Sequence, residues 1–141
     1  MTSPTQAGRP ADVEPTTLSV VWNKLGYLAE QVGEKVLYST QSFVTAMARD
    51  LGQSILDRQG RIVIAASTAP IHTLVAEEAI KGLERIFHGD YHPDDYIIAN
   101  DPYSVRGGHL PDWNFIRPLF YKGEHIGFFQ AKTHVSDTGG F

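Results

Sequence analysis

The chain has 141 residues, of which 42% are hydrophobic and 20% are charged, with a formal net charge of −4 at pH 7 and no cysteine. These values are typical of one globular domain, and they argue against nucleic acid as a partner and exclude disulfides, thiolate catalysis and cysteine–zinc sites. The sequence has no apolar run near the roughly 20 residues of a membrane span and no secretion signal, so we expect a cytoplasmic protein without membrane contact.

The N-terminal part predicts a disordered arm followed by a long helix. Residues 1–15 are rich in Thr, Ser, Pro, Gly and Ala without hydrophobic periodicity, which is typical of disorder. Thr16 or Thr17 is expected to cap the helix that follows. Apolar residues recur at three- and four-residue steps over Leu18–Val36, which predicts an amphipathic helix. Two glycines inside it weaken the helix by about 1 kcal/mol each relative to alanine, unless packing requires their small size.

The middle of the chain predicts a β-hairpin and a second helix. Two apolar runs flank a turn at Asp57–Arg61, which is typical of a hairpin. Before it, the Arg49-Asp50 dipeptide is interpreted as a structural pair, either buried or at the surface. A second amphipathic helix is expected from Leu74 to Phe87. His72, just ahead of that helix, is interpreted as a capping or packing residue.

These elements predict the α+β class, with the N-terminal helix, antiparallel hairpins and the second helix packed on a mixed sheet. The polar connector at residues 88–95 contains histidine and aspartate but is interpreted as a solvated loop. Tyr96–Ala99 is predicted to be a short buried strand that leads into the loop Asn100–Asp112. Within this loop, Asp101 is a candidate catalytic residue that either caps a turn or orients a metal-bound histidine.

Residues 113–132 predict two strands joined by a tight turn at Lys122–Glu124. A three-residue loop would place Asp112 directly opposite His134, with both side chains on the same face of the hairpin. A two-residue loop would pair Pro111 with His134 instead. In both registers, the two ends of the hairpin lie close together.

Each end of this hairpin carries a histidine with an aspartate three residues on: His109 with Asp112, and His134 with Asp137. A single pair of this kind is more often a surface or capping pair. Two of them, each beside a Gly-Gly pair and joined by a hairpin, predict a site for a divalent metal such as manganese, zinc or iron. We predict His109, Asp112 and His134 as the ligands. Asp137 is predicted to be a catalytic residue that orients a ligand or acts as a fourth one.

The sequence also allows predictions for three further side chains near these motifs. Pro118, inside the first strand of the hairpin, indicates an edge strand or a bulge. His125 directly follows the turn and is expected to be exposed. Arg106 either binds a carboxylate or phosphate with its guanidinium group or is a solvated loop charge.

The segments Asn100–Tyr103, Gly107–Asp112 and Thr133–Gly140 resemble the hydantoinase B/oxoprolinase family. This family includes large subunits of ATP-dependent hydantoinases and of acetone and acetophenone carboxylases. The resemblance extends from about Leu18 to Phe141, and it implies that the three predicted ligands hold a divalent metal, which is manganese in some members of the carboxylase branch. Family members run to several hundred residues, so residues 16–141 are expected to be the N-terminal portion of such a domain, truncated.

The resemblance also implies a partner, a hydantoinase A-like subunit that uses ATP. Gly107-Gly108 lacks the GKS or GKT ending of a phosphate-binding loop, so ATP is expected only through that partner. The chain is therefore interpreted as the metal-bearing part of an ATP-dependent hydrolase of cyclic amides, which acts on a small molecule within a hetero-oligomer. Two alternatives are a subunit of an acetone- or acetophenone-type carboxylase and a non-catalytic scaffold fragment of such a complex.

Overall fold

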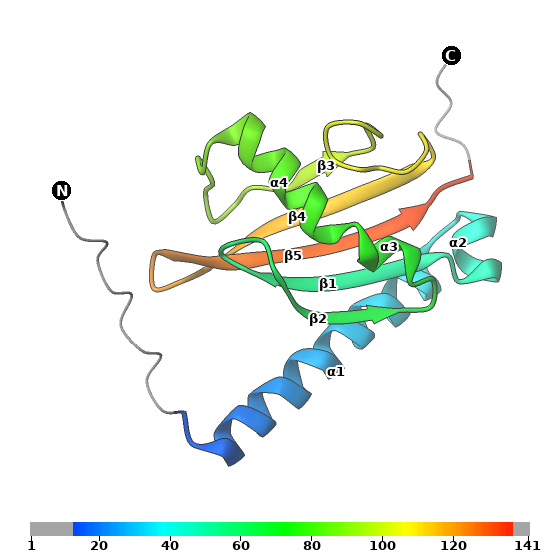
Figure 1. The fold of residues 1–141 in the computed structure, drawn as a ribbon. Coiled ribbons are helices and arrows are strands. Elements are labelled where there is room, and N and C mark those ends of the chain that lie inside the picture. Colours follow the sequence, from blue (N-terminus) through cyan, green and yellow to red (C-terminus); the bar gives the residue numbers. More distant parts are fainter. Residues whose placement is uncertain (1–12, 137–141) are drawn as a thin grey trace.

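The computed structural model describes residues 13–136, which form a five-stranded sheet with helices on both faces (Figure 1). The strand order is β2-β1-β5-β4-β3. The strands are β1 (Leu51–Asp57), β2 (Ile62–Ser67), β3 (Ile97–Ala99), β4 (Asp112–Tyr121) and β5 (Glu124–His134). The helices are α1 (Pro15–Ser39), α2 (Phe43–Ala48), α3 (Ile71–Leu74) and α4 (Ala76–Phe87). The α+β class is confirmed, although all strand pairs of the described residues are antiparallel where we expected a mixed sheet.

The two faces of the sheet are covered by different helices. α3 and α4 lie over one face, and α1 crosses the other face beneath β1 and β2 (Figure 1). The hydrophobic core lies between the sheet and α4, where burial of apolar surface holds the helix in place. It is formed by Leu56, Ala76, Ala79, Ile80, Leu83, Tyr91, Val105, Ile116 and Phe128.

Both predicted helices are present, but they begin differently from the prediction. The N–H groups of Thr16 and Thr17 donate to the Glu14 carboxylate, so Glu14 caps α1 in place of a threonine, and the helix begins at Pro15. The hydrogen bond from the Thr16 N–H is the largest of the contacts that lower the pKa of Glu14 to about 2. The second helix is interrupted at Val75, which separates α3 from α4. Among the helices described, none combines the length and the apolar character that crossing a bilayer requires.

The two glycines of α1 have different surroundings. A Cβ atom at Gly33 would lie 2.8 Å from the side-chain amide of Gln53, a buried side chain on β1 that would have to shift to make room. A Cβ atom at Gly26 would meet nothing within 4 Å. We therefore expect Gly26→Ala to raise the free energy of unfolding by about 0.5–1 kcal/mol, because alanine loses less backbone entropy in a helix. Urea denaturation measures the change, and Gly33→Ala, expected to destabilise, is the matched comparison. A loss of stability in Gly26→Ala would contradict the expectation.

The β4–β5 hairpin has the predicted register near its open end, for a different reason than predicted. Its turn has two residues, Lys122 and Gly123, both with positive φ (51° and 84°). The ladder then shifts by one residue between Leu119 and Phe120. This bulge restores the register of a three-residue loop, so Asp112 pairs with His134.

The strand at the far edge of the sheet differs from its prediction. Residues 97–99 form an edge strand, β3, in which Ile98 is 56% exposed, whereas we expected a buried strand. β3 pairs with β4 only at residues 114–116. Pro118 therefore lies beyond the reach of β3 and next to the bulge, which confirms the interpretation of its position.

The prediction that His125 is exposed is wrong. Its ring packs against the rings of Tyr91, Phe120 and Phe128, at centroid distances of 5.4, 5.2 and 4.6 Å. Its Nε2 atom donates to the carbonyl of Gly127 at 2.9 Å. The side chain is thus part of the aromatic packing at the turn end of the hairpin.

Candidate metal centre

The hairpin register brings the three predicted ligands together. Asp112 and His134 are paired across β4 and β5, which places their side chains on the same face of the sheet. The Nδ1 atoms of His109 and His134 each lie 3.2 Å from Oδ1 of Asp112. The two imidazole ring centroids are 4.8 Å apart. Each of the three residues thus offers a ligand atom within 4.8 Å of the other two, a spacing that suits one shared ion.

The environment of Asp112 fits a bound cation. Its Oδ1 atom is buried and has no hydrogen-bond partner among the described residues. Leaving a buried charged oxygen unsatisfied costs more than the roughly 1–3 kcal/mol of a neutral polar group, and a cation would offset that cost. Two ligands at about 2.0–2.2 Å from a tetrahedral ion lie roughly 3.3–3.6 Å apart, close to the 3.2 Å between Oδ1 and each histidine. Two imidazoles and a carboxylate suit manganese, zinc or iron.

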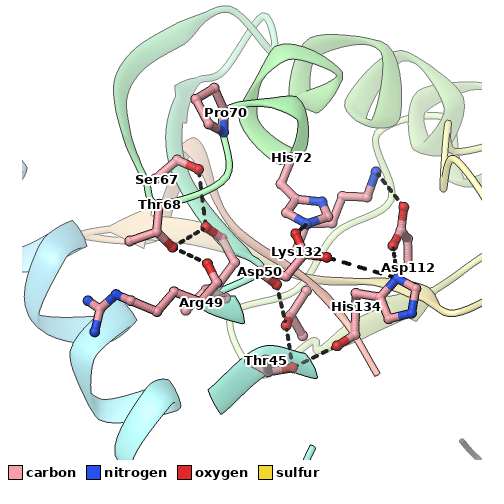
Figure 2. Close-up of polar contacts among 12 residues, drawn as sticks. Thr45, Arg49, Asp50, Ser67, Thr68, Pro70, His72, Asp112, Lys132 and His134 are labelled. Carbon is pink, nitrogen blue, oxygen red and sulfur yellow. Dashed lines mark hydrogen bonds and ion pairs between the residues drawn. The ribbon is translucent and has the colours of Figure 1, made fainter. Parts of the chain in front are cut away.

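A second carboxylate, that of Asp50, lies beside this cluster (Figure 2). Its Oδ2 atom is 4.0 Å from Nδ1 of His134, and its Oδ1 atom is 2.6 Å from Nε2 of the buried His72. The sequence indicates Asp50 only as part of the Arg49-Asp50 dipeptide, whereas Arg49 pairs with Glu34. Its proximity to His134 depends on the pairing of β1 with β5, for which the sequence carries no local signal.

Two threonines fix the backbone at the strand ends that carry the site. The hydroxyl of Thr45, on α2, donates to the carbonyl of His134 at 2.7 Å. The hydroxyl of Thr133 donates to the carbonyl of Asp50 at 2.9 Å, and the N–H of His134 donates to the same carbonyl at 3.3 Å. These contacts, drawn in part in Figure 2, join β5, α2 and the start of β1 at the candidate centre.

The loop before β4 delivers His109 through a tight turn. The N–H of Asp112 donates to the carbonyl of His109 at 2.8 Å, and the side-chain amide of Asn100 donates to the carbonyl of Leu110 at 2.8 Å. Gly108 has a φ of +90°, and a Cβ atom there would lie 2.7 Å from Oδ2 of Asp112. A larger residue would displace the buried carboxylate, which explains the glycine beside His109.

Asp101 stabilises the same loop. Its carboxylate accepts hydrogen bonds from the N–H groups of Ser104 at 2.5 Å and Tyr103 at 2.8 Å, and these bonds lower its pKa. This is the capping alternative of the sequence analysis, and a catalytic role for Asp101 stays a prediction. Arg106 has an exposed side chain and a φ of 52°, and its carbonyl accepts a hydrogen bond from Nζ of Lys132 at 3.4 Å.

Two other candidates remain from the sequence analysis. Asp137 lies outside the described residues, so its role as an orienting residue or fourth ligand stays a prediction. In the connector at residues 88–95, His92 is 3.9 Å from Asp90 and 3.6 Å from Asp95, and all three side chains are exposed. This arrangement confirms a solvated loop at these three positions.

Comparisons with known proteins agree with the resemblance of the motifs. A family model described as hydantoinase B/oxoprolinase matches residues 14–141. A 5-oxoprolinase of Pestalotiopsis fici is 30% identical over 135 residues, which are 96% of this chain and 10% of that protein. Caprolactamase subunit beta of Pseudomonas jessenii is 29% identical over 128 residues, which are 91% of this chain and 22% of that subunit.

Solved structures share the fold. The crystal structure of ATP-dependent caprolactamase from Pseudomonas jessenii superposes with a TM-score of 0.78 at 25% identity, covering 92% of this chain and 22% of that one. The nucleotide-free structure of acetone carboxylase superposes with a TM-score of 0.74 at 26% identity, covering 86% of this chain and 17% of that one. The chain therefore spans between 10% and 22% of the length of these relatives. Because the family model matches nearly all of it, the chain belongs to the hydantoinase B/oxoprolinase family.

Proposed function

We propose that this chain is the metal-bearing part of a subunit of an ATP-dependent amidohydrolase of the hydantoinase/oxoprolinase type. The observation that carries the proposal is the convergence of His109, Asp112 and His134 around one buried carboxylate oxygen without a hydrogen-bond partner in the described residues. Membership of the family, with a 5-oxoprolinase and a caprolactamase subunit among the relatives, supports a cyclic amide as the small-molecule substrate.

The three ligand side chains differ in exposure, which gives the candidate centre an open side and a closed side. The side chain of His109 is 62% exposed, that of His134 23% and that of Asp112 11%. A substrate can approach past His109, while Asp112 anchors the centre on the sheet. A divalent ion held there would polarise a substrate carbonyl or lower the pKa of a bound water.

The proposed assembly combines this chain with a hydantoinase A-like subunit that binds ATP in the cytoplasm. The sequence contains no GKS or GKT phosphate-binding motif. A relative in Pseudomonas jessenii is named as one subunit, and the caprolactamase of that organism is ATP-dependent. Exposed apolar side chains on α1 and on β3 and β4 offer surface for contacts with further protein. They include Leu18, Val21, Trp22, Leu28, Ile98 and Phe115.

A second candidate function is carboxylation, because the acetone carboxylase structure superposes on this chain almost as well as the caprolactamase does. The proposal places both reactions at the same candidate centre, so the substrate distinguishes them. The third alternative, a non-catalytic scaffold fragment, differs in that it requires no metal.

The functional test combines the chain with a hydantoinase A-like subunit, ATP and one of two substrate sets. We expect ATP-dependent ring opening of 5-oxoproline, hydantoin or caprolactam, which chromatography of the ring-opened product detects. Carboxylation of acetone or acetophenone without amide hydrolysis would favour the carboxylase alternative. Inactivity in both assays, with no bound metal, would favour the scaffold alternative.

Metal content gives a direct prediction. We expect protein purified without chelator to contain about one manganese, zinc or iron ion per chain, because one cluster of three ligands occurs in the described residues. Inductively coupled plasma mass spectrometry measures the ratio before and after dialysis against a chelator. Protein that contains no transition metal before dialysis and binds none when it is resupplied would contradict the centre.

A further inference from the structure

Each carboxylate at the candidate centre has one oxygen that faces a buried basic side chain (Figure 2). Nε2 of His72 lies 2.6 Å from Oδ1 of Asp50, and Nζ of Lys132 lies 3.8 Å from Oδ2 of Asp112. Both basic residues are only 2% exposed. The other oxygen of each carboxylate is the one nearest to Nδ1 of His134, at 4.0 Å for Asp50 and 3.2 Å for Asp112.

We propose that Lys132 and His72 are positioning residues that make Asp112 and Asp50 one-oxygen ligands of the bound ion. The inference rests on the metal centre of the proposed function and extends it. Each basic side chain lies next to the oxygen that is farther from Nδ1 of His134, which leaves the other oxygen of each carboxylate to face the ion. The chain's own residues then offer two imidazoles and two single oxygens, a set that suits small four- to six-coordinate ions. Calcium, which takes six to eight oxygens and often two from one carboxylate, fits poorly.

The position of Lys132 supports a role beyond filling space. A buried ammonium group is strongly unfavourable unless it is paired, and within the described residues the one carboxylate within 4.0 Å of Nζ is that of Asp112. The ladder places Lys132 between Gly52 of β1 and Asn114 of β4. A Cβ atom at Gly52 would lie 2.8 Å from Cβ of His72, so the absence of a side chain there admits His72 next to Lys132.

Positioning and simple electrostatics predict opposite changes in metal affinity when the Lys132 side chain is removed. A positive charge near the centre repels a divalent cation, so charge alone predicts tighter binding when the charge is lost. Loss of positioning predicts weaker binding, because Asp112 can then rotate or bind through both oxygens. The typical effect of a residue that orients a ligand is 10- to 100-fold in metal affinity.

The experiment titrates the full chain, freed of metal with a chelator, with manganese alone and with zinc alone. We expect Lys132→Met, which preserves the length and apolar stem of the side chain, to weaken binding about 10- to 100-fold, and Lys132→Arg to restore part of it. Lys81→Met, which removes an exposed lysine paired with Glu78, should leave the affinity unchanged. Cobalt as a spectroscopic probe adds a second readout, because its visible absorption weakens when a carboxylate changes from one-oxygen to two-oxygen binding.

The parallel variants at His72 keep the proposal falsifiable if Lys132→Met fails to fold, which circular dichroism would reveal. His72→Leu should weaken binding about tenfold, and His72→Gln, which keeps a donor toward Asp50, should recover most of it. Unchanged or tighter binding in folded Lys132→Met, or equal binding in both His72 variants, would overturn the proposal. If the unmodified chain binds neither manganese, zinc nor cobalt, the metal centre itself is wrong, so the two failures are distinguishable.

Discussion

His134→Ala is expected to leave the chain almost free of metal. The substitution removes one of three ligand atoms that lie within 4.8 Å of one another, and it leaves Oδ1 of Asp112 with a single imidazole beside it. The loss should exceed the 10- to 100-fold typical of a residue that only orients a ligand. Elemental analysis after equilibrium dialysis against a limiting concentration of manganese measures the effect.

Two other variants show how much each side chain contributes to metal binding. His92→Ala is the matched control, because it removes an exposed histidine that also lies near aspartates, and we expect unchanged metal content. Asp137→Ala should retain most of the metal while losing roughly 10- to 100-fold in affinity or rate. If Asp137→Ala removes the metal as completely as His134→Ala does, Asp137 is a primary ligand. A His134→Ala protein that still holds one ion per chain would contradict the centre.

Gly82→Ala is expected to be the most destabilising glycine-to-alanine substitution in the described part of the chain. Gly82 lies on the buried face of α4, and a Cβ atom there would lie 1.8 Å from the carbonyl oxygen of Ser104 and 3.2 Å from Cα of Val105. Relieving that overlap requires the helix and the loop backbone to separate. We expect a loss of about 3 kcal/mol or more, which corresponds to roughly 10 °C in the melting temperature for a domain of this size.

Thermal unfolding followed by circular dichroism tests this expectation. Gly26→Ala is the control, since the same atom is added in a helix where it meets nothing within 4 Å. The loop that touches Gly82 continues to His109, so a folded Gly82→Ala protein should also bind metal less tightly. A melting temperature equal to that of the unmodified chain would show that α4 and the loop are farther apart in solution.

The sequence predicted most of the helices and strands. It also predicted the correct register of the hairpin, although from the wrong loop length. Alternating apolar residues and a glycine-containing turn located both strands, and the predicted pairing of Asp112 with His134 is correct. Its basis, a three-residue loop, is wrong, because the two-residue turn and the bulge at Leu119 and Phe120 together give the same offset. Pro118 indicated an edge strand or a bulge in this strand, but how a bulge changes the pairing depends on side-chain packing across strands, which a single sequence does not reveal.

The residues that the sequence analysis missed are those placed by tertiary contacts. Asp50 reaches His134 because β1 pairs with β5, and strand order has no local signature. The partial burial of His125 was missed for a similar reason. Its ring is covered by Tyr91, which comes from a connector that is otherwise polar and solvated.

The strand order also determines when the candidate centre can come into existence as the chain is made. β5 is translated after the other four strands, yet it lies in the middle of the sheet, between β1 and β4. The β1–β2 hairpin and the β3–β4 pair can therefore join into one sheet only when β5 lies between them. His134, at the end of β5, arrives beside Asp50 and Asp112 only at that moment. Ion uptake is thus tied to the pairing of β5 with both of its neighbours, and metal supplied during synthesis would stabilise the completed sheet.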